Sequence, residues 1–301
     1  MREWSAEVVV DEALARLLLR QFPELAVHSL ELVAEGWDNT VWLVDGTWAF
    51  RFPRRTIAIP GVEREIAVLP RLAPLLPLPV PVPTFVGRPA HGYPWAFFGA
   101  RFLAGREPAD AALSDTARAA IARPLATFLH TLHTADADAF AGDLPADPMG
   151  RGDMAARVPR TRDRLAEVAH EGLWQAPASV ERVLAEAERL PPARATALVH
   201  GDLHFRHVLV DDDGSLCGVI DWGDVCRGDP AIDLPLYWSF FDLAGREAFL
   251  DAYGPIREEQ LLRGRILALF LAAVLALYAR HERMPALEQE AVAGLVRASA
   301  D

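Results

Sequence analysis

The stretch from Leu198 to Asp233 limits the folds open to this 301-residue chain more than any other segment. It holds two short apolar runs, Val208–Val210 and Leu216–Ile220, and the five residues between them read Asp-Asp-Asp-Gly-Ser. Short, partly β-branched runs joined by turn-forming residues are typical of a β-hairpin. The sequence therefore predicts a small two-stranded ribbon in the middle of this stretch.

Three side chains with metal-binding or acid–base chemistry flank the predicted ribbon. His207 enters the first strand, Asp221 leaves the second, and Asp202 lies five residues before His207. Because a hairpin brings its outer ends together, we expect His207 and Asp221 to be neighbours. A metal-assisted transfer needs such a set, in which one carboxylate orients a nucleophile and two further ligands hold a divalent cation.

The order of these residues resembles the motif of the aminoglycoside phosphotransferase-like (kinase-like) family of small-molecule kinases. The resemblance is carried by His-Gly-Asp at 200–202, the histidine at 207, Asp-Trp-Gly-Asp at 221–224 and Asp-Pro-Ala-Ile-Asp at 229–233. The family includes aminoglycoside 2''-phosphotransferases and macrolide phosphotransferases. The likeness continues upstream of these motifs and covers most of the chain.

The resemblance implies a role for each of these positions. Asp202 is expected to be the catalytic aspartate, and His207 and Asp221 are expected to hold Mg²⁺. Asp233 and His200 are expected to support the catalytic loop structurally. Position 207 is usually asparagine in this family, and a histidine there is similar to the pattern of macrolide phosphotransferases.

The same resemblance implies nucleotide-binding residues nearer the N-terminus. Arg51 stands where the family has a lysine or arginine that pairs with nucleotide phosphates, and Glu65 matches the glutamate that pairs with that cation. The chain contains no lysine, so a role normally given to lysine is either filled by arginine or left empty. The other positions implied in nucleotide binding are Trp37, Asn39, Thr40, Arg101 and Leu103.

The expected fold class is α+β, as a bilobal protein-kinase-like fold. An N-terminal lobe, residues 1–104, is expected to hold an antiparallel sheet with one or two helices. A larger, mostly helical C-terminal lobe is expected to span 105–301, with a hinge at about 101–105. Strands are predicted at 30–33, 40–44, 47–52, 84–86 and 95–102, and helices at 5–22, 62–72, 115–133, 157–170, 178–189, 233–242, 244–253, 257–281 and 286–299.

The reaction that the resemblance implies is transfer of the γ-phosphoryl group of ATP or GTP, with Mg²⁺, to a hydroxyl of a small molecule. Aminoglycoside or macrolide antibiotics are the expected acceptors, while choline, homoserine and ketosamine kinases share the same fold and motif. A cationic acceptor would use carboxylates and aromatic faces of the C-terminal helices. The expected substrate-binding residues are Asp224, Asp229, Trp238, Phe241, Asp242 and Tyr253.

The amino-acid composition indicates which classes of binding partner and which cellular compartment suit this chain. A formal charge of -12 argues against a nucleic-acid partner and is compatible with a small cationic substrate. Two cysteines give no disulfide framework and indicate a reducing compartment. The longest apolar run, 266–279, is shorter than the roughly 20 residues that span a bilayer. We therefore expect a cytoplasmic protein without a membrane partner.

Two other classes of function remain open from the residues. His200, His204 and His207 would lie on one face of a helix and could bind zinc as in a metallohydrolase, although Gly201 and the hairpin disfavour a helix there. Alternatively, arginine at 51 and histidine at 207 are changes that occur in inactive, nucleotide-binding relatives of kinases. The retained Asp202 and Asp221 favour an enzyme over such a module.

Overall fold

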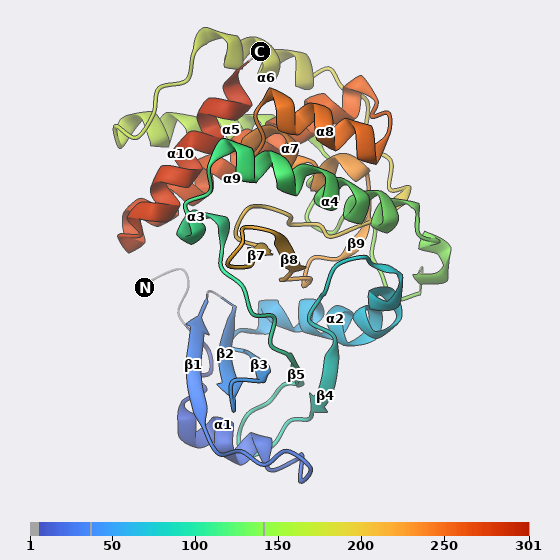
Figure 1. The fold of residues 1–301 in the computed structure, drawn as a ribbon, viewed down its shortest axis with the longest axis vertical. Helices are drawn as coiled ribbons and strands as arrows, with labels where there is room; N and C mark the ends of the chain where they lie inside the picture. Colours follow the sequence, from blue (N-terminus) through green and yellow to red (C-terminus); the bar gives the residue numbers. More distant parts are fainter. Residues whose placement is uncertain (1–5, 37, 141, 301) are drawn as a thin grey trace. The chain divides into compact units, whose positions relative to one another are not determined.

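A computed structural model describes residues 6–36, 38–140 and 142–300. The chain divides into two compact units. The N-terminal unit comprises Met1–Pro74 and Pro79–Leu103, and the C-terminal unit comprises Leu75–Leu78 and Ala104–Asp301. One unit is built on an antiparallel sheet and the other mainly on helices, which confirms the predicted α+β class (Figure 1).

The N-terminal unit is built on one five-stranded antiparallel sheet. Its strands follow the order β1-β2-β3-β5-β4, and their bounds are Leu30–Glu35, Asn39–Val44, Trp48–Pro53, Phe97–Arg101 and Pro83–Gly87, respectively. Asp45 and Gly46 both have positive φ at the β2–β3 turn, as a tight hairpin of this kind requires. The predicted strand 95–102 is shorter in the structure, because pairing within β5 begins at Phe97.

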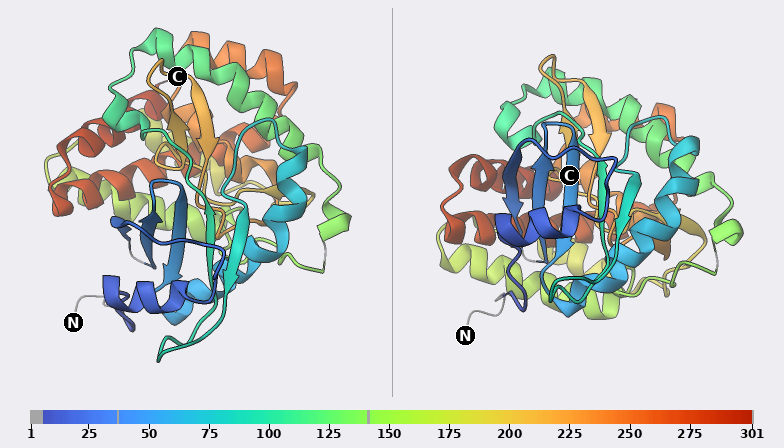
Figure 2. Two further views of the ribbon diagram at one scale, coloured as in Figure 1. Left: turned by 60° about the horizontal axis from the view of Figure 1, so that its bottom comes forward. Right: turned by 90° about the horizontal axis from the view of Figure 1, so that it is seen from below.

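Successive residues of β5 point to opposite faces of this sheet, and each face is covered by a helix. Phe97 packs in a cluster with α1 (Glu12–Leu19), whereas Phe98 packs in a cluster with Val62 of α2 (Ile59–Leu72). Figure 2 shows α1 lying across the strands. The prediction of a helix at 5–22 is too long, because Asp11 caps the helix by accepting from the amide of Leu14 at 2.8 Å.

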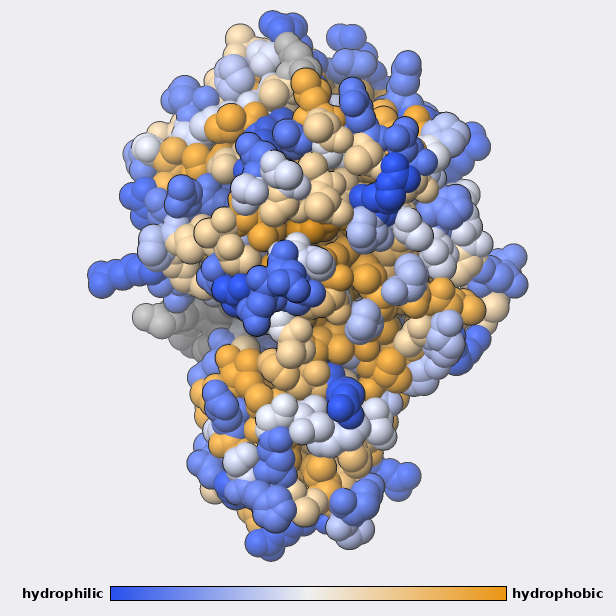
Figure 3. All heavy atoms as spheres, in the orientation of Figure 1, coloured by the Kyte–Doolittle hydropathy of each residue, from blue (hydrophilic) through white to orange (hydrophobic). Residues whose placement is uncertain are grey.

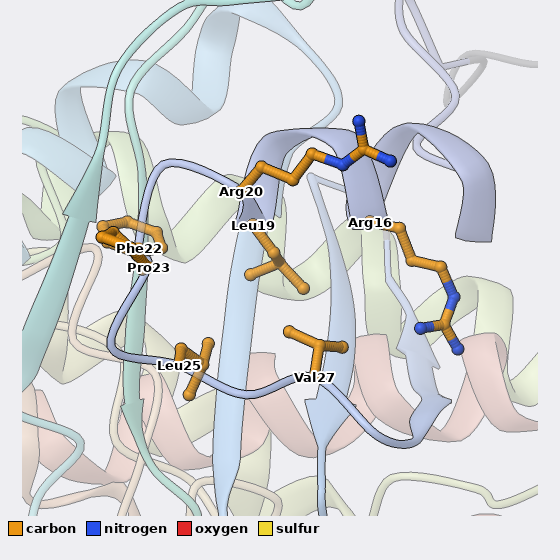
Figure 4. A pocket seen from close by; sticks show the side chains of 7 residues that line it. All are labelled: Arg16, Leu19, Arg20, Phe22, Pro23, Leu25 and Val27. Atoms are coloured by element: carbon orange, nitrogen blue, oxygen red, sulfur yellow. The ribbon is translucent and has the colours of Figure 1, made fainter.

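A hollow of about 390 Å³ lies between the end of α1 and the loop that follows it. Figure 4 shows the side chains of Leu19, Leu25 and Val27 pointing toward one another, with Arg16 and Arg20 at the rim. Among the residues that the structure describes, none of those predicted to act on a nucleotide or a substrate lines it.

The C-terminal unit is organised around the long helix α9 (Glu258–Glu282), whose neighbours include α10, α7, α5 and α6. The buried ion pair Arg118–Glu290, at 2.6 Å, joins α4 to α10. The remaining helices in this unit are α3 (Pro108–Ala111), α4 (Asp115–Thr134), α5 (Met154–His170), α6 (Ala178–Ala187), α7 (Pro235–Ser239), α8 (Leu243–Tyr253) and α10 (Pro285–Ser299). The single helix predicted at 233–242 is replaced by a 3₁₀ turn, Pro230–Asp233, and the short α7.

Helix α9 is long and apolar enough, by length and composition, to cross a membrane. In the structure, however, 56% of its most apolar window is buried against the unit's other helices. Hydrophilic residues are spread over the surface of the helical unit in the view of Figure 3, with hydrophobic residues between them. These features describe a core helix.

Two small antiparallel ribbons carry the motif residues of the C-terminal unit. One pairs β7 (Val208–Val210) with β8 (Leu216–Val219), which confirms the predicted hairpin. The other pairs β6 (Ala197–Val199) with β9 (Cys226–Gly228), strands that the sequence analysis did not predict. The segment with His200, Gly201 and Asp202 leaves β6, and the segment that begins at Asp221 leaves β8 and enters β9.

Candidate active site in the C-terminal unit

His207 and Asp221 meet at the open end of the β7–β8 hairpin. The amide of Ile220 donates to the carbonyl oxygen of His207 at 2.9 Å, which closes the ladder beside the two side chains. Nε2 of His207 lies 3.3 Å from Oδ2 of Asp221. Asp221 has a φ of 63°, a left-handed conformation that is uncommon outside glycine and turns the chain sharply after the strand.

The hydrogen bonds of His207 define what its two ring nitrogens can do. Nδ1 lies 2.8 Å from the backbone carbonyl oxygen of Asp202, and since a carbonyl only accepts, Nδ1 carries the proton. In the neutral ring, Nε2 then presents a lone pair toward the carboxylate of Asp221. Two electron-pair donors facing each other at 3.3 Å fit a cation held by both.

Asp233 holds the loop that carries Asp202. Its completely buried carboxylate accepts from the amide of His200 at 2.7 Å and from the amide of Gly201 at 2.9 Å. It also accepts from Nε2 of His133 at 3.1 Å, and Nδ1 of His133 in turn accepts from the hydroxyl of Tyr253 at 2.7 Å. The carboxylate thus fixes two consecutive backbone amides immediately before Asp202.

Gly201 lets the same loop pass against the segment that carries Asp224. Its φ is +90°, and a Cβ at this position would lie 2.2 Å from the backbone oxygen of Asp224. Any larger residue would have to displace backbone on one side or the other. This close approach brings Asp202 and Asp224 into one site.

The two oxygens of the Asp202 carboxylate have different surroundings. Oδ1 accepts from Arg151 at 3.0 Å. Oδ2 lies 3.8 Å from Nε2 of His204 and 3.9 Å from Nδ1 of His207, beyond hydrogen-bond distance of both. The side chain is 25% exposed, so it can accept a hydrogen bond from a ligand.

The three histidines singled out for a zinc site are not on a helix. Nε2 of His200 donates to the carbonyl oxygen of Ile220 at 3.0 Å, and its Nδ1 accepts from the amide of Asp202 at 3.3 Å. Both nitrogens of His200 are therefore used within the protein. Burial lowers the pKa of His200 and lowers that of His204 further, which keeps both rings neutral.

A different group of potential ligands is present nearby. Asp202, His204 and His207 offer ligand atoms that lie within 4.8 Å of one another. Nδ1 of His204 accepts from the amide of Arg206 at 3.3 Å, so its Nε2 carries the proton and faces Asp202. His204 therefore turns an N–H group toward Asp202. The neutral ring of His207, by contrast, turns the lone pair of its Nε2 toward the carboxylate of Asp221.

Arg151 is a residue of this site that the sequence analysis did not identify. Its NH2 group donates to Oδ1 of Asp202 at 3.0 Å and to Oδ2 of Asp224 at 2.6 Å. Burial disfavours the charged guanidinium, but the carboxylates of Asp202 and Asp224 outweigh burial and raise the pKa of Arg151. Arg151 lies 51 residues before Asp202, in a segment for which neither a helix nor a strand is predicted, so no local pattern indicated it.

In the N-terminal unit, the predicted partners Arg51 and Glu65 form an ion pair. NH1 of Arg51 donates to the fully buried carboxylate of Glu65 at 2.9 Å. With its amide oxygen turned toward the guanidinium, Asn39 accepts from NH2 and Nε of Arg51 at 2.9 and 3.0 Å. Asn39 therefore orients the arginine from the neighbouring strand β2.

The other residues predicted to bind nucleotide lie at several places in this unit. Thr40 is 4% exposed and pairs with Phe52 in the sheet. Arg101 ends β5 with an exposed side chain, and Leu103 is the last residue of the unit. Trp37 lies outside the residues that the structure describes.

Two of the three carboxylates predicted to bind substrate have structural partners instead. Asp229 is 2% exposed and accepts from the amide of Ala231 and from the side chain of Gln260, both at 3.0 Å. Asp242 caps α8 by accepting from the amide of Gly245 at 2.8 Å. The carboxylate of Asp229 is thus buried and already hydrogen-bonded, and a role in substrate binding stays a prediction.

The aromatic residues predicted to bind substrate belong largely to the packing. Phe241 is completely buried, and its role in substrate binding stays a prediction. The indole of Trp238 lies between the guanidinium groups of Arg246 and Arg265, at 4.6 and 4.8 Å, and donates to a backbone carbonyl. The hydroxyl of Tyr253 donates a hydrogen bond to Nδ1 of His133.

Comparison with known proteins assigns this arrangement to a family. The model of the APH phosphotransferase enzyme family matches residues 29–266. Viomycin phosphotransferase of Streptomyces vinaceus is 35% identical over 164 residues, which are 53% of this chain and 49% of that protein. The uncharacterized protein YcbJ of Bacillus subtilis (strain 168) is 38% identical over 58 residues, or 19% of each chain. The chain therefore spans at most about half the length of these relatives.

Solved structures share the fold over nearly the whole chain. The GDP and kanamycin complex of APH(2")-IIIa matches with a TM-score of 0.71 and 23% identity, over 96% of this chain and 98% of that one. Macrolide 2'-phosphotransferase MphH from Brachybacterium faecium matches with a TM-score of 0.61 and 26% identity, over 95% and 98%. Both likenesses confirm the predicted kinase-like fold.

Proposed function

Because the chain belongs to the phosphotransferase enzyme family, we propose that it transfers the γ-phosphoryl group of ATP or GTP to a hydroxyl of a small molecule. The observation that carries the proposal is the environment of Asp202. Its Oδ2 is within hydrogen-bond distance of neither neighbouring histidine, and its loop is fixed by Asp233 beside His207 and Asp221. That is the arrangement a carboxylate needs to orient an attacking hydroxyl.

In this proposal Asp202 accepts a hydrogen bond from the acceptor hydroxyl and aligns its oxygen with the γ-phosphorus. Little covalent chemistry is required of the protein, so position and charge dominate the rate. The hydrogen bonds that the Asp233 carboxylate accepts from the amides of His200 and Gly201 keep the side chain of Asp202 in place as the hydroxyl approaches. His200 and His133 support this loop and do not exchange protons with the substrate.

His207 and Asp221 are the residues that would hold Mg²⁺. The lone pair on Nε2 of His207 and the carboxylate of Asp221, 3.3 Å apart, are a donor set that fits a divalent cation. Mg²⁺ prefers oxygen ligands, and imidazole suits softer metals, so Asp221 is the stronger ligand of the two. A bound Mg²⁺ would neutralise charge on the nucleotide phosphates.

Arg51 is proposed to bind the nucleotide phosphates. Its guanidinium is held by Glu65 and Asn39, which reduces the conformational entropy lost on binding. GDP and ATP complexes of structural neighbours support a nucleoside triphosphate as the donor. Arg101 and Leu103, at the end of the unit, are proposed to contact the base through their backbone groups.

The acceptor that we propose is an aminoglycoside or macrolide antibiotic. Structural neighbours include a kanamycin complex and two macrolide 2'-phosphotransferases, and a curated relative is a viomycin phosphotransferase. A metabolite kinase acting on choline, homoserine or a ketosamine is the second candidate, because that chemistry uses the same carboxylate and cation. We place the activity in the cytoplasm, with no nucleic-acid or membrane partner.

A coupled phosphoryl-transfer assay tests this proposal. The panel holds kanamycin, erythromycin, viomycin, choline, homoserine and a ketosamine, each with ATP and with GTP in the presence of Mg²⁺. Turnover with one class of acceptor is the expected result. Nucleotide binding without turnover of any acceptor would contradict the proposal and favour a nucleotide-binding module.

A further inference from the structure

One guanidinium nitrogen joins the two carboxylates of the candidate active site. NH2 of Arg151 donates to Oδ1 of Asp202 at 3.0 Å and to Oδ2 of Asp224 at 2.6 Å. The arginine side chain is only 15% exposed. Charge-assisted bonds in such a sheltered position are stronger than bonds between exposed ions.

The backbone that carries Arg151 is fixed on both sides. Asp147 accepts from the amides of Arg151 and Gly152, both at 2.8 Å. A Cβ at Gly152 would lie 2.6 Å from Cβ of Ala193, so the loop fits closely against its neighbour. The amide of Asp147 donates to the carbonyl oxygen of Arg227 at 2.8 Å, which ties this loop to β9.

Arg151 reaches Asp202 from the side away from the proposed metal ligands. It bonds Oδ1, whereas His204 and His207 are the neighbours of Oδ2. Asp221 in turn lies 3.3 Å from Nε2 of His207. The space next to Arg151 and Asp224 is therefore where groups attached to the reacting hydroxyl would lie, rather than the phosphates.

A second arginine adds positive charge close to Arg151. Arg157 on α5 is 6% exposed, and its guanidinium stacks on the ring of Phe270 at 4.5 Å. Among the described residues, its guanidinium has no hydrogen-bonding or ion-pair partner. Burial, and then the charge of Arg151, lower the pKa of Arg157 to about 10.

We propose that Arg151 is an internal cation of the acceptor subsite, which positions Asp202 and excludes ammonium groups from the side of Asp224. The inference rests on the proposed function and refines its substrate class. Arg151 carries one positive charge between the two carboxylates, and together with the nearby charge of Arg157 it offsets their two negative charges, which weakens their attraction for an ammonium group. The part of the acceptor that lies beside Asp224 is therefore neutral or anionic.

Displacement of Arg151 by a cationic ligand is disfavoured by the same contacts. A ligand would have to break both carboxylate bonds of a guanidinium that is largely withdrawn from water. Such a displacement is costly because the largely buried guanidinium would lose both of its carboxylate partners. The backbone contacts of Asp147 further limit how far the arginine can move.

Calorimetric titration of kanamycin into the intact protein tests the proposal without turnover. We expect Arg151→Gln to bind kanamycin at least about tenfold more tightly than the unsubstituted protein, because the variant removes a positive charge from beside two carboxylates. Adding Asp224→Asn to Arg151→Gln should remove most of this gain. Arg123→Gln, at an arginine that is 61% exposed, is the matched control and should leave the affinity unchanged.

Kinetics with the acceptor found in the panel test the positioning role. Arg151→Gln should lower kcat by about ten- to a hundredfold while leaving nucleotide affinity unchanged, and Arg151→Lys should recover part of the loss. Equal kanamycin affinity in the unsubstituted protein and Arg151→Gln would overturn the exclusion of ammonium groups. Unchanged kcat in Arg151→Gln would overturn the positioning role. If no acceptor in the panel is phosphorylated, the phosphotransferase proposal is contradicted instead. The comparison of kanamycin affinities then still tests whether Arg151 excludes ammonium groups.

Discussion

At residue 207, one imidazole donates a hydrogen bond with Nδ1 and, in its neutral form, presents a lone pair with Nε2. Nδ1 fixes the ring to the carbonyl oxygen of Asp202, and Nε2 faces the carboxylate of Asp221. An asparagine can do both tasks, because its amide group donates through nitrogen and accepts through oxygen. The oxygen is also the ligand that Mg²⁺ prefers.

His207→Asn is therefore expected to keep or raise activity with Mg²⁺. His207→Leu, which has a similar bulk but no polar group, should lose at least about 90% of the activity. Initial rates with Mg²⁺ and with Mn²⁺ provide the measurement. Complete inactivity of a folded His207→Asn protein would show that the histidine has a task other than ligation.

The sequence could indicate those site residues whose spacing is set by one hairpin. Asp202, His207 and Asp221 lie within 20 residues of one another, and the β7–β8 ribbon brings them together. Arg151 could not be found in this way, because its position depends on how Asp147 ties a distant loop to β9. The burial of Phe241 and Asp229 likewise depends on helix packing that a single sequence does not reveal.

At the scale of elements, the loop after β6 and the segment before β9 are packed backbone against backbone. Gly201 permits this contact, since its Cβ would lie 2.2 Å from the oxygen of Asp224. Gly172 is a useful comparison, because it also has a positive φ, +67°, but nothing lies within 4 Å of its Cβ position. A substitution at Gly172 therefore tests the cost of a left-handed backbone alone, whereas one at Gly201 adds the cost of a steric clash.

Gly172→Ala should lower the free energy of unfolding by about 1 kcal/mol, the cost of a left-handed conformation. Gly201→Ala should cost more, because it adds a backbone clash, and should reduce turnover by at least about a hundredfold as Asp202 moves. Denaturant unfolding and initial rates measure the two effects. Equal losses of stability in both variants, with activity retained, would contradict the close packing of these segments.

Elements with a regular apolar period were predictable, and their ends were less so. The helix expected at 257–281 is α9, one residue further along at each end. The first helix is much shorter than 5–22, because capping by Asp11, rather than apolar periodicity, fixes its start. The three-residue strands β6 and β9 are too short to give a pattern in the sequence.

At the scale of the whole molecule, a nucleotide that binds the native chain must stabilise it by mass action. If Asp221 holds Mg²⁺ with the nucleotide, Asp221→Ala should abolish the stabilisation that depends on Mg²⁺. We expect MgATP or MgGTP at about 100 times its dissociation constant to add roughly 2.7 kcal/mol to the stability of the unsubstituted protein. Thermal unfolding with and without Mg²⁺ measures this difference, and an equal shift in Asp221→Ala would contradict the ligand assignment.

The comparison of Asp202→Ala with the unsubstituted protein tests the central claim most directly. Turnover would be measured with the acceptor and nucleotide identified in the panel, alongside calorimetric titration of the nucleotide. The proposed role of Asp202 predicts loss of turnover with nucleotide affinity and the unfolding transition nearly unchanged. If a folded Asp202→Ala protein keeps more than about a tenth of the activity, Asp202 does not orient the acceptor hydroxyl.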